Sequence, residues 1–121
     1  MGGRGASSGF VSKIPNAESA TIADNKITKF LLDPEKKHYA EFVAVGYSKD
    51  DPERLKRDLL AGLNTSNAKM YEKNAHGDTA FEVDMMLGVT RKAKFRTAWQ
   101  IDRGAENPRF ITAHRIGVNR K

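Results

Sequence analysis

The apolar pattern of the chain changes its period near Lys69, and this change constrains the fold more than any other feature of the sequence. Before Lys69, apolar residues recur three and four positions apart, which is typical of helices with one buried side. After it, apolar and polar residues alternate, which is typical of strands with one buried face. Helices followed by a run of strands predict an α+β domain. A chain of 121 residues is long enough to form one such domain around its own core.

Three helices are expected before the change of period. Asp24 suits the N-cap of the first helix, and Pro34 ends it because proline disfavours the α conformation of the residue before it. The second lies in KKHYAEFVAVGYS, with Gly46 at its end, and the third begins at Asp51 and Pro52. The expected inward-facing residues are Ile27, Phe30 and Leu31 in the first helix, Tyr39, Phe42 and Val43 in the second, and Leu55, Leu59 and Leu63 in the third.

Four strands are expected after the change of period: AKMYEK, TAFEVDMML, AKFRTAWQID and RFITAHRI. The turn sequences NAHGD, GVTRK and RGAENP separate them, and such short connections join antiparallel neighbours. The predicted architecture is therefore two to three N-terminal helices packed on one face of a roughly four-stranded antiparallel sheet, with the other face open. Residues 1–20 are rich in Gly, Ser and Ala and are expected to form a flexible tail, which leaves residues 21–121 as the single α+β domain.

The open face of the sheet depends on the register of the last two strands. If Arg96 lies opposite His114, these two side chains share the open face with Thr112, and Trp99 meets Ile111 in the core.

A slip by one residue would instead place Arg96 opposite Arg115 and Thr97 opposite His114, and it would move every side chain of the strand to the other face. The first register is favoured because it avoids two like charges side by side on neighbouring strands. The sequence alone leaves both open.

Charge and composition limit the classes of partner and cofactor that the chain is expected to bind. The formal net charge is +6, and the segment Arg91–Lys121 holds nine basic residues against two acidic ones, which favours a polyanionic partner such as nucleic acid.

With no cysteine, the chain offers no disulfide, thiolate metal site or cysteine nucleophile, and its three histidines lack metal-ligand spacing. Without a phosphate-binding glycine loop, a dinucleotide fingerprint or a serine elbow, we expect no cofactor. No apolar run approaches ~18 residues, so we expect no membrane partner and a location in the host cytoplasm.

Two groups of residues suggest chemistry on phosphates. Arg96, Thr112 and His114 would form one cluster on the open face, where arginine binds a phosphate through its fork and histidine transfers protons near neutral pH. Lys36, Lys37 and His38 lie at the start of the second helix, where a cation helps to hold an anion. Such a set suits cleavage of RNA without a metal. A base takes the proton of the attacking 2′-hydroxyl, an acid protonates the leaving 5′-oxygen, and a cation stabilises the charged phosphate.

Three segments, LLDPEKKHYAEFVAVGYS, FRTAWQIDRG and PRFITAHR, resemble small phage-associated and toxin-associated domains of the barnase/EndoU/RelE-like nuclease superfamily, in particular a phage-associated branch. The resemblance covers roughly residues 24–117. It implies a helical N-terminal portion packed on an antiparallel sheet, and metal-independent RNase activity in many members. By position it also implies a list of active residues: Lys37, His38, Arg96, Thr97, Thr112 and His114.

Two functional hypotheses follow. The first is a phage- or mobile-element-encoded, metal-independent endoribonuclease that acts on RNA or tRNA through a basic sheet face, with a possible immunity protein as partner. The second is a non-catalytic phage protein that uses this face to bind nucleic acid or to inhibit a host defence complex, such as a nucleic-acid-guided ribonucleoprotein. The expected catalytic residues are His38, Arg96, Thr112 and His114, and the expected substrate-binding residues are Lys37, Lys94, Thr97, Arg103 and Arg115.

Overall fold

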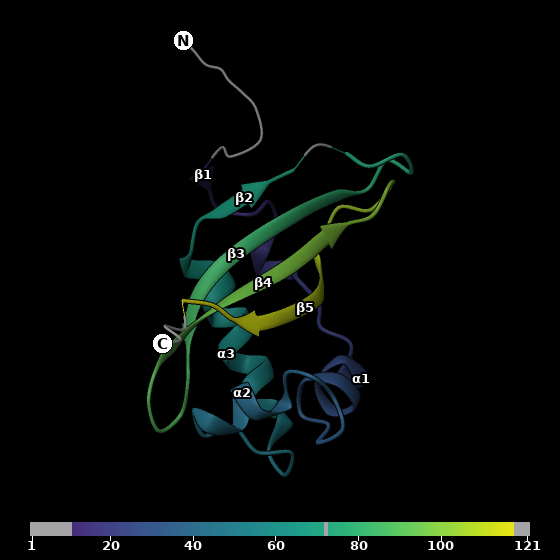
Figure 1. Cartoon of the computed structure of the whole chain (residues 1–121). Coiled ribbons are helices and arrows are strands. Elements are labelled where there is room, and N and C mark those ends of the chain that lie inside the picture. Colours follow the sequence, from purple (N-terminus) through teal and green to yellow (C-terminus); the bar gives the residue numbers. More distant parts are fainter. Residues whose placement is uncertain (1–10, 72, 118–121) are drawn as a thin grey trace.

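The computed structural model describes residues 11–71 and 73–117, which form an α+β fold with helices on one face of an antiparallel sheet (Figure 1). The sheet strands lie in chain order, β1-β2-β3-β4-β5, and each is antiparallel to the next. This confirms the predicted fold class. The strands are β1 (Val11–Ser12), β2 (Ala68–Met70), β3 (Thr79–Leu87), β4 (Ala93–Ile101) and β5 (Arg109–Arg115).

The longest helix, α3 (Pro52–Thr65), lies against the covered face of the sheet (Figure 1). Its leucine row, Leu55, Leu59 and Leu63, is fully buried, as the spacing predicts. Gly62 allows helix and sheet to approach closely, because a Cβ atom there would lie 2.5 Å from the sulfur of Met85. A side chain at this position would force the side chain of Met85 to move.

The first helical segment differs from the prediction. It consists of α1 (Asp24–Lys26) and one π-helical turn, η2 (Ile27–Leu31), in which the amide of Leu32 donates to the carbonyl of Ile27 at 2.8 Å. Such a wide turn brings residues four and five positions apart to one side, so Ile27, Leu31 and Leu32 are buried together. The predicted inward position of Phe30 is therefore wrong: its side chain is 47% exposed.

The second helix, α2 (Tyr39–Ala44), is short and ends at Gly46 as predicted. Gly46 has φ +105°; its amide donates to the carbonyl of Val43, and the amide of Tyr47 donates to that of Phe42. This pair of bonds is a Schellman motif, which glycine favours because it adopts positive φ at low cost. Phe42 is buried and its ring stacks on Phe95 of β4, with 4.7 Å between centroids. Phe42 thereby fixes α2 to the sheet.

Tyr47 links the end of α2 to α3 and to the β3–β4 turn. Its hydroxyl donates to Oδ2 of Asp58 at 2.7 Å and accepts from the amide of Gly88 at 2.9 Å. Burial, together with the neighbouring Asp58 carboxylate, raises the pKa of the Tyr47 hydroxyl above its ordinary value. The hydroxyl therefore stays neutral and keeps both bonds.

Residues 11–20 belong to the fold, so the predicted tail ends earlier than residue 20. β1 pairs with β2, and Ile14 and Ala17 are buried in the core. Ala17 begins a single 3-10 turn, η1 (Ala17–Ser19). The buried residues of this segment sit in irregular backbone, which explains why no period marks them in the sequence. The remaining part of the predicted tail, residues 1–10, lies outside the described residues.

The register of β4 and β5 follows the favoured prediction at one end and departs from it at the other. Arg96 lies opposite His114, as predicted. The register then shifts between Ala98 and Trp99, so Trp99 lies opposite Phe110, and the predicted pairing of Trp99 with Ile111 is wrong. The shift leaves Ile111 as the extra residue of a bulge, which returns Phe110 to the core against the edge of the Trp99 ring.

Thr97 is a core residue, which contradicts its predicted role in substrate binding. It is fully buried on the helix-covered face of β4. Its hydroxyl donates to the carbonyl of Val83 at 2.7 Å and accepts from Nε1 of Trp99 at 2.7 Å. The hydroxyl therefore supplies the acceptor for the buried indole N–H of Trp99 and adds a hydrogen bond to the carbonyl of Val83.

We expect Thr97→Val to lower the free energy of unfolding by about 1–3 kcal/mol, because it leaves the Trp99 N–H and the Val83 carbonyl without that partner. Urea unfolding followed by circular dichroism measures the change. Thr112→Val is the matched control, since Thr112 is exposed on the same hairpin, and we expect a change of less than about 0.5 kcal/mol. Equal stability of the two variants would show that the buried hydroxyl contributes nothing.

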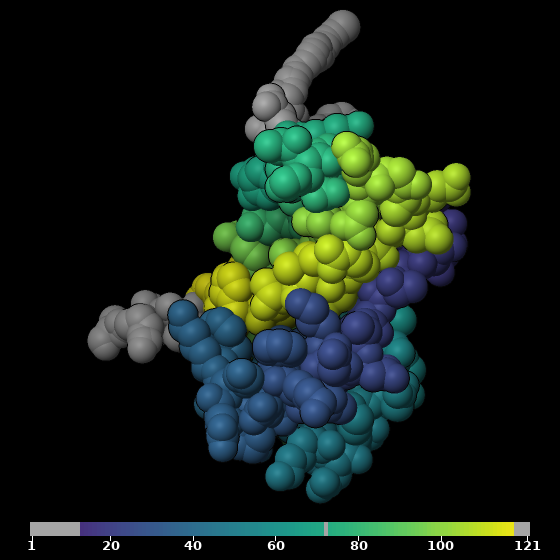
Figure 2. All heavy atoms as spheres, turned by 90° about the vertical axis from the view of Figure 1, so that its right-hand side faces the viewer, coloured from purple at the N-terminus to yellow at the C-terminus, as the bar shows by residue number. Residues whose placement is uncertain are grey.

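Much of the outer edge of β5 is covered by the segment that precedes α2. The amide of Thr21 donates to the carbonyl of Pro108 and its carbonyl accepts from the amide of Phe110, at 3.0 and 2.9 Å. Further along, the ammonium of Lys26 donates to the carbonyl of Ile111 at 3.0 Å. Figure 2 shows β5 directly beside the helical segment on one continuous surface. The covered edge is unavailable to further strands, and side chains of the helical segment are brought beside those of β5.

Candidate active site

The start of α2 and the end of β5 bring two predicted catalytic residues together. The rings of His38 and His114 stack with 5.5 Å between their centroids and an angle of 29° between their planes. Glu41, on the first turn of α2, binds both elements. We call His38, Glu41 and His114 the histidine edge.

Glu41 orients His38 and attaches α2 to the sheet. Its Oε1 atom lies 3.0 Å from Nδ1 of His38 and accepts the amide hydrogen of Arg115 at 2.9 Å. A carboxylate next to Nδ1 favours the tautomer with hydrogen on Nδ1, which leaves Nε2 of His38 as a proton acceptor. The histidine edge thus contains an imidazole whose orientation is fixed by a carboxylate.

His114 shares the open face of the sheet with Arg96 and adjoins His38 across the edge of β5. It is half-buried, and among the described residues its ring forms no hydrogen bond. Neither ring nitrogen of His114 is therefore engaged by another described residue. The ring of His38 is held by the carboxylate of Glu41, whereas, among the described residues, the ring of His114 is held only by its stacking on His38.

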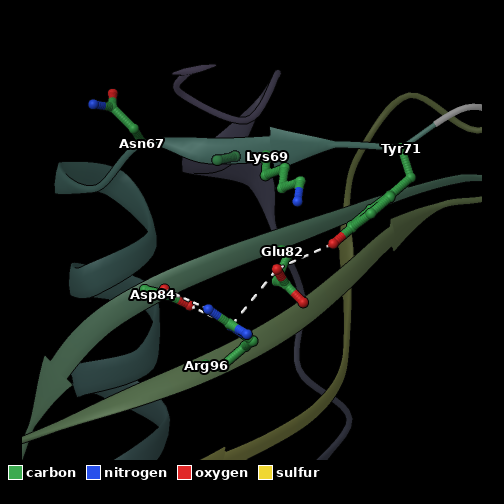
Figure 3. A pocket seen from close by; sticks show the side chains of 7 residues that line it. Asn67, Lys69, Tyr71, Glu82, Asp84 and Arg96 are labelled. Atoms are coloured by element: carbon green, nitrogen blue, oxygen red, sulfur yellow. Dashed lines mark hydrogen bonds and ion pairs between the residues drawn. The ribbon is translucent and has the colours of Figure 1, made fainter. Parts of the chain in front are cut away.

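Arg96 lies opposite His114 in the register, and its side chain lines a shallow hollow on the open face, where it is bound by residues of β3 (Figure 3). Its Nε and Nη2 atoms donate to Asp84 at 2.9 and 3.1 Å, and Nε lies 3.6 Å from Oε1 of Glu82. The hydrogen bonds to Asp84 raise the pKa of Arg96, so the guanidinium stays charged. Tyr71 donates to Glu82 at 3.1 Å, and the ammonium of Lys69 lies 5.3 Å from the centre of the Tyr71 ring.

This hollow, of about 350 Å³, is close to electrically neutral. Two carboxylates balance Lys69 and Arg96, and the fork that the sequence analysis assigned to phosphate is occupied by Asp84. The Nε–Nη2 side of Arg96 is thereby closed to a phosphate, and only the Nη1 side is left without a partner among the described residues. Arg109 is paired in the same way with Asp102, whose pKa is lowered by hydrogen bonds from Arg109 and Gln100. The two arginines therefore hold the sheet face together.

Three other predicted residues lie near the histidine edge. Lys94 and Thr112 share the open face with His114, each as an exposed neighbour on the same hairpin. Lys94 is the diagonal neighbour of His114, at a Cβ separation of ~7–8 Å, which a lysine side chain can span. Lys37 is exposed and directly precedes His38.

Two predicted binding residues lie elsewhere. Arg103 follows the far end of β4, where its amide donates to Asp78, and the last residue of the strand, Ile101, lies roughly 17 Å along it from Arg96. Arg115 lies opposite Phe95, so the register directs it to the helix-covered side of the sheet. These two residues do not join His38 and His114 at one phosphate position.

Glu41 was not predicted, although the sequence carries a signal for it. It follows His38 by three positions, a spacing that places both side chains on one face of a helix. The signal is weak without the structure, because the same spacing occurs in many solvated helices. The amide of Arg115, which Glu41 also binds, lies 74 positions further along the chain. No local pattern reports such a contact.

Within residues 11–71 and 73–117, no group of three or more His, Asp or Glu residues is arranged to hold a metal ion. No helix in this part of the chain is long and apolar enough to cross a membrane.

Comparison with known proteins gives one result. A family model described as "Domain of unknown function (DUF6883)" matches residues 13–117, which include every described helix and nearly all of the sheet. No curated protein and no solved structure matches the chain.

Proposed function

The chain belongs to the DUF6883 family, whose description assigns no function, and we propose from the histidine edge that the protein is a metal-independent endoribonuclease. The observation that carries this proposal is the contact between His38 and His114, with Glu41 bound to His38. Two adjacent imidazoles, one of them oriented by a carboxylate, provide a base and an acid for one reaction centre.

The base step begins at the 2′-hydroxyl of the RNA. Nε2 of His38 takes the proton of this hydroxyl, and the oxygen attacks the neighbouring phosphorus. Glu41 stabilises the imidazolium that forms, because its carboxylate lies 3.0 Å from Nδ1. This role resembles that of the carboxylate in other base-assisted sites, where it holds the ring and stabilises its charge.

The acid step releases the leaving group. A protonated His114 gives its proton to the departing 5′-oxygen as the bond between phosphorus and that oxygen breaks. The products are a 2′,3′-cyclic phosphate on one fragment and a 5′-hydroxyl on the other. His38 ends protonated and His114 ends neutral, and proton exchange with water restores both residues.

Lys37 and Lys94 are the cations that this proposal assigns to the phosphate. Both are exposed, one beside His38 in the chain and one diagonal to His114 on the sheet. Their charges stabilise the negative charge that builds up on the phosphate oxygens in the transition state. We assign to Thr112, which is exposed two residues before His114, a hydrogen bond to the same phosphate group.

The non-catalytic alternative relies on a basic sheet face, and the ion pairs of that face weigh against it. Arg96 and Arg109 are each bound by two hydrogen bonds to an aspartate. Arginines that already bind carboxylates release few counterions when nucleic acid approaches. Lys37 and Lys94, for which the described residues supply no ion pair, instead adjoin His38 in the chain and His114 on the sheet.

Incubation of the purified protein with tRNA in EDTA tests the proposal, with Glu41→Gln as the informative variant. Discrete fragments are expected from the wild-type protein, and slower cleavage from Glu41→Gln, because glutamine still accepts from the Arg115 amide but cannot stabilise charged His38. Absence of cleavage, with salt-sensitive binding of the tRNA, would overturn the proposal in favour of the binding function.

A further inference from the structure

The exposed ring of Phe30 lies in the helical segment that leads to His38, and its surroundings suit a nucleic-acid base. The π-helical turn η2 directs Phe30 outward, whereas its neighbour Leu31 is buried. A large aromatic ring that is 47% exposed has no role in the core. Wide turns of this kind occur often at functional sites.

Lysines surround this ring. The ammonium groups of Lys26 and Lys36 lie 5.5 and 5.2 Å from its centroid. Lys29 and Lys37 are exposed in the same segment, where the acidic residues are Asp33 and Glu35, so the local balance is basic. We call Lys26, Phe30 and Lys36 the aromatic–basic patch.

The aromatic–basic patch and the histidine edge lie on one surface. Lys36 is two residues from His38 in the chain, and Lys26 donates to the carbonyl of Ile111, three residues before His114 on β5. Three residues of a strand span about 10 Å. Figure 2 shows that this surface is continuous from β5 to the helical segment below it. A short oligonucleotide can therefore reach both places.

We infer that the aromatic–basic patch is a binding subsite for single-stranded RNA, in which a base next to the cleaved nucleotide stacks on Phe30 and Lys36 binds the backbone. The inference rests on the proposed function for its choice of ligand, and it adds a substrate class: unpaired RNA. A base that stacks on Phe30 replaces the contact between this exposed ring and the ammonium group of Lys36. The exposed contact between ring and ammonium is weaker than the stacking of a base. Lys36 is then free to bind a phosphate.

Stacking on an aromatic ring is tolerant of sequence, because every base has a flat face. The subsite therefore selects unpaired strands and discriminates little among bases. Paired RNA keeps its bases inside the helix and cannot use Phe30.

Binding of a 2′-O-methyl oligonucleotide tests the inference separately from catalysis, because this analogue lacks the attacking hydroxyl and cannot be cleaved. We expect Phe30→Ala to bind a fluorescent single strand about 10-fold more weakly than the wild-type protein, and Phe30→Trp to bind it as well as the wild type. Lys36→Ala is expected to weaken binding and to reduce the salt dependence by about one counterion. Met86→Ala is the control, since Met86 is 54% exposed on the sheet and lies outside the patch.

The two proposals fail in different ways. Binding that depends on Phe30, without cleavage of ordinary RNA, would leave the subsite standing and contradict the proposed catalysis. Cleavage of ordinary RNA, with equal binding by Phe30→Ala and Met86→Ala, would overturn the subsite. Failure of the wild-type protein to bind the single strand would overturn it as well.

Discussion

We expect His114→Ala to lower the rate of RNA cleavage by at least ~100-fold in EDTA, because it removes the acid that protonates the leaving 5′-oxygen. His38→Ala is expected to cause a loss of similar size, because it removes the base. The double variant should be little slower than either single variant, since the two groups act on one transition state. Single-turnover cleavage of a labelled RNA measures these rates.

His76→Ala is the matched control for the histidine variants. His76 is exposed in the turn before β3, at the opposite end of the sheet from His114, and its amide donates to Asn74. Its removal should leave both cleavage and unfolding unchanged. A loss of activity in His76→Ala equal to that in His114→Ala would show that the histidine edge has no special role.

The largest effect on stability is expected from Phe42→Ala, which should lower the free energy of unfolding by about 3–5 kcal/mol. Phe42 is fully buried and stacks on Phe95, so its truncation opens a cavity between α2 and the sheet. Chemical unfolding followed by circular dichroism measures the loss. Val43→Ala alters the neighbouring residue of α2, which is 41% exposed, and should change stability by less than about 0.5 kcal/mol.

The same pair of variants tests how the histidine edge is held. Because Phe42 fixes the helix that carries Glu41, the variant Phe42→Ala should lose activity even under conditions in which it remains folded. Full activity in folded Phe42→Ala would show that α2 need not be anchored for His38 to meet His114.

The sequence predicts the strands and α3 well because their apolar periods are regular. The alternation in TAFEVDMML and the leucine row of α3 each point to a single buried face, and the structure confirms both. The register of Arg96 with His114 was also predictable, since the alternative would place two arginines side by side. These features depend on neighbours in the chain or on simple electrostatics.

The features that were missed depend on contacts between distant residues or on irregular backbone. A single extra residue, Ile111, changes the partner of Trp99, and no local signal marks it. The π-helical turn reverses the expected direction of Phe30, because the helical period assumed for that segment does not hold there. The ion pair of Arg96 with Asp84 could not be predicted from β4 and β5 alone, because it depends on the register of β3 with β4.

The measurement that tests the central claim most directly is the chemical identity of the ends produced from RNA in EDTA. Attack by the 2′-hydroxyl with His38 and His114 as base and acid predicts a 2′,3′-cyclic phosphate on one fragment and a 5′-hydroxyl on the other. Fragments that carry a 5′-phosphate, or cleavage that requires an added divalent cation, would contradict the account.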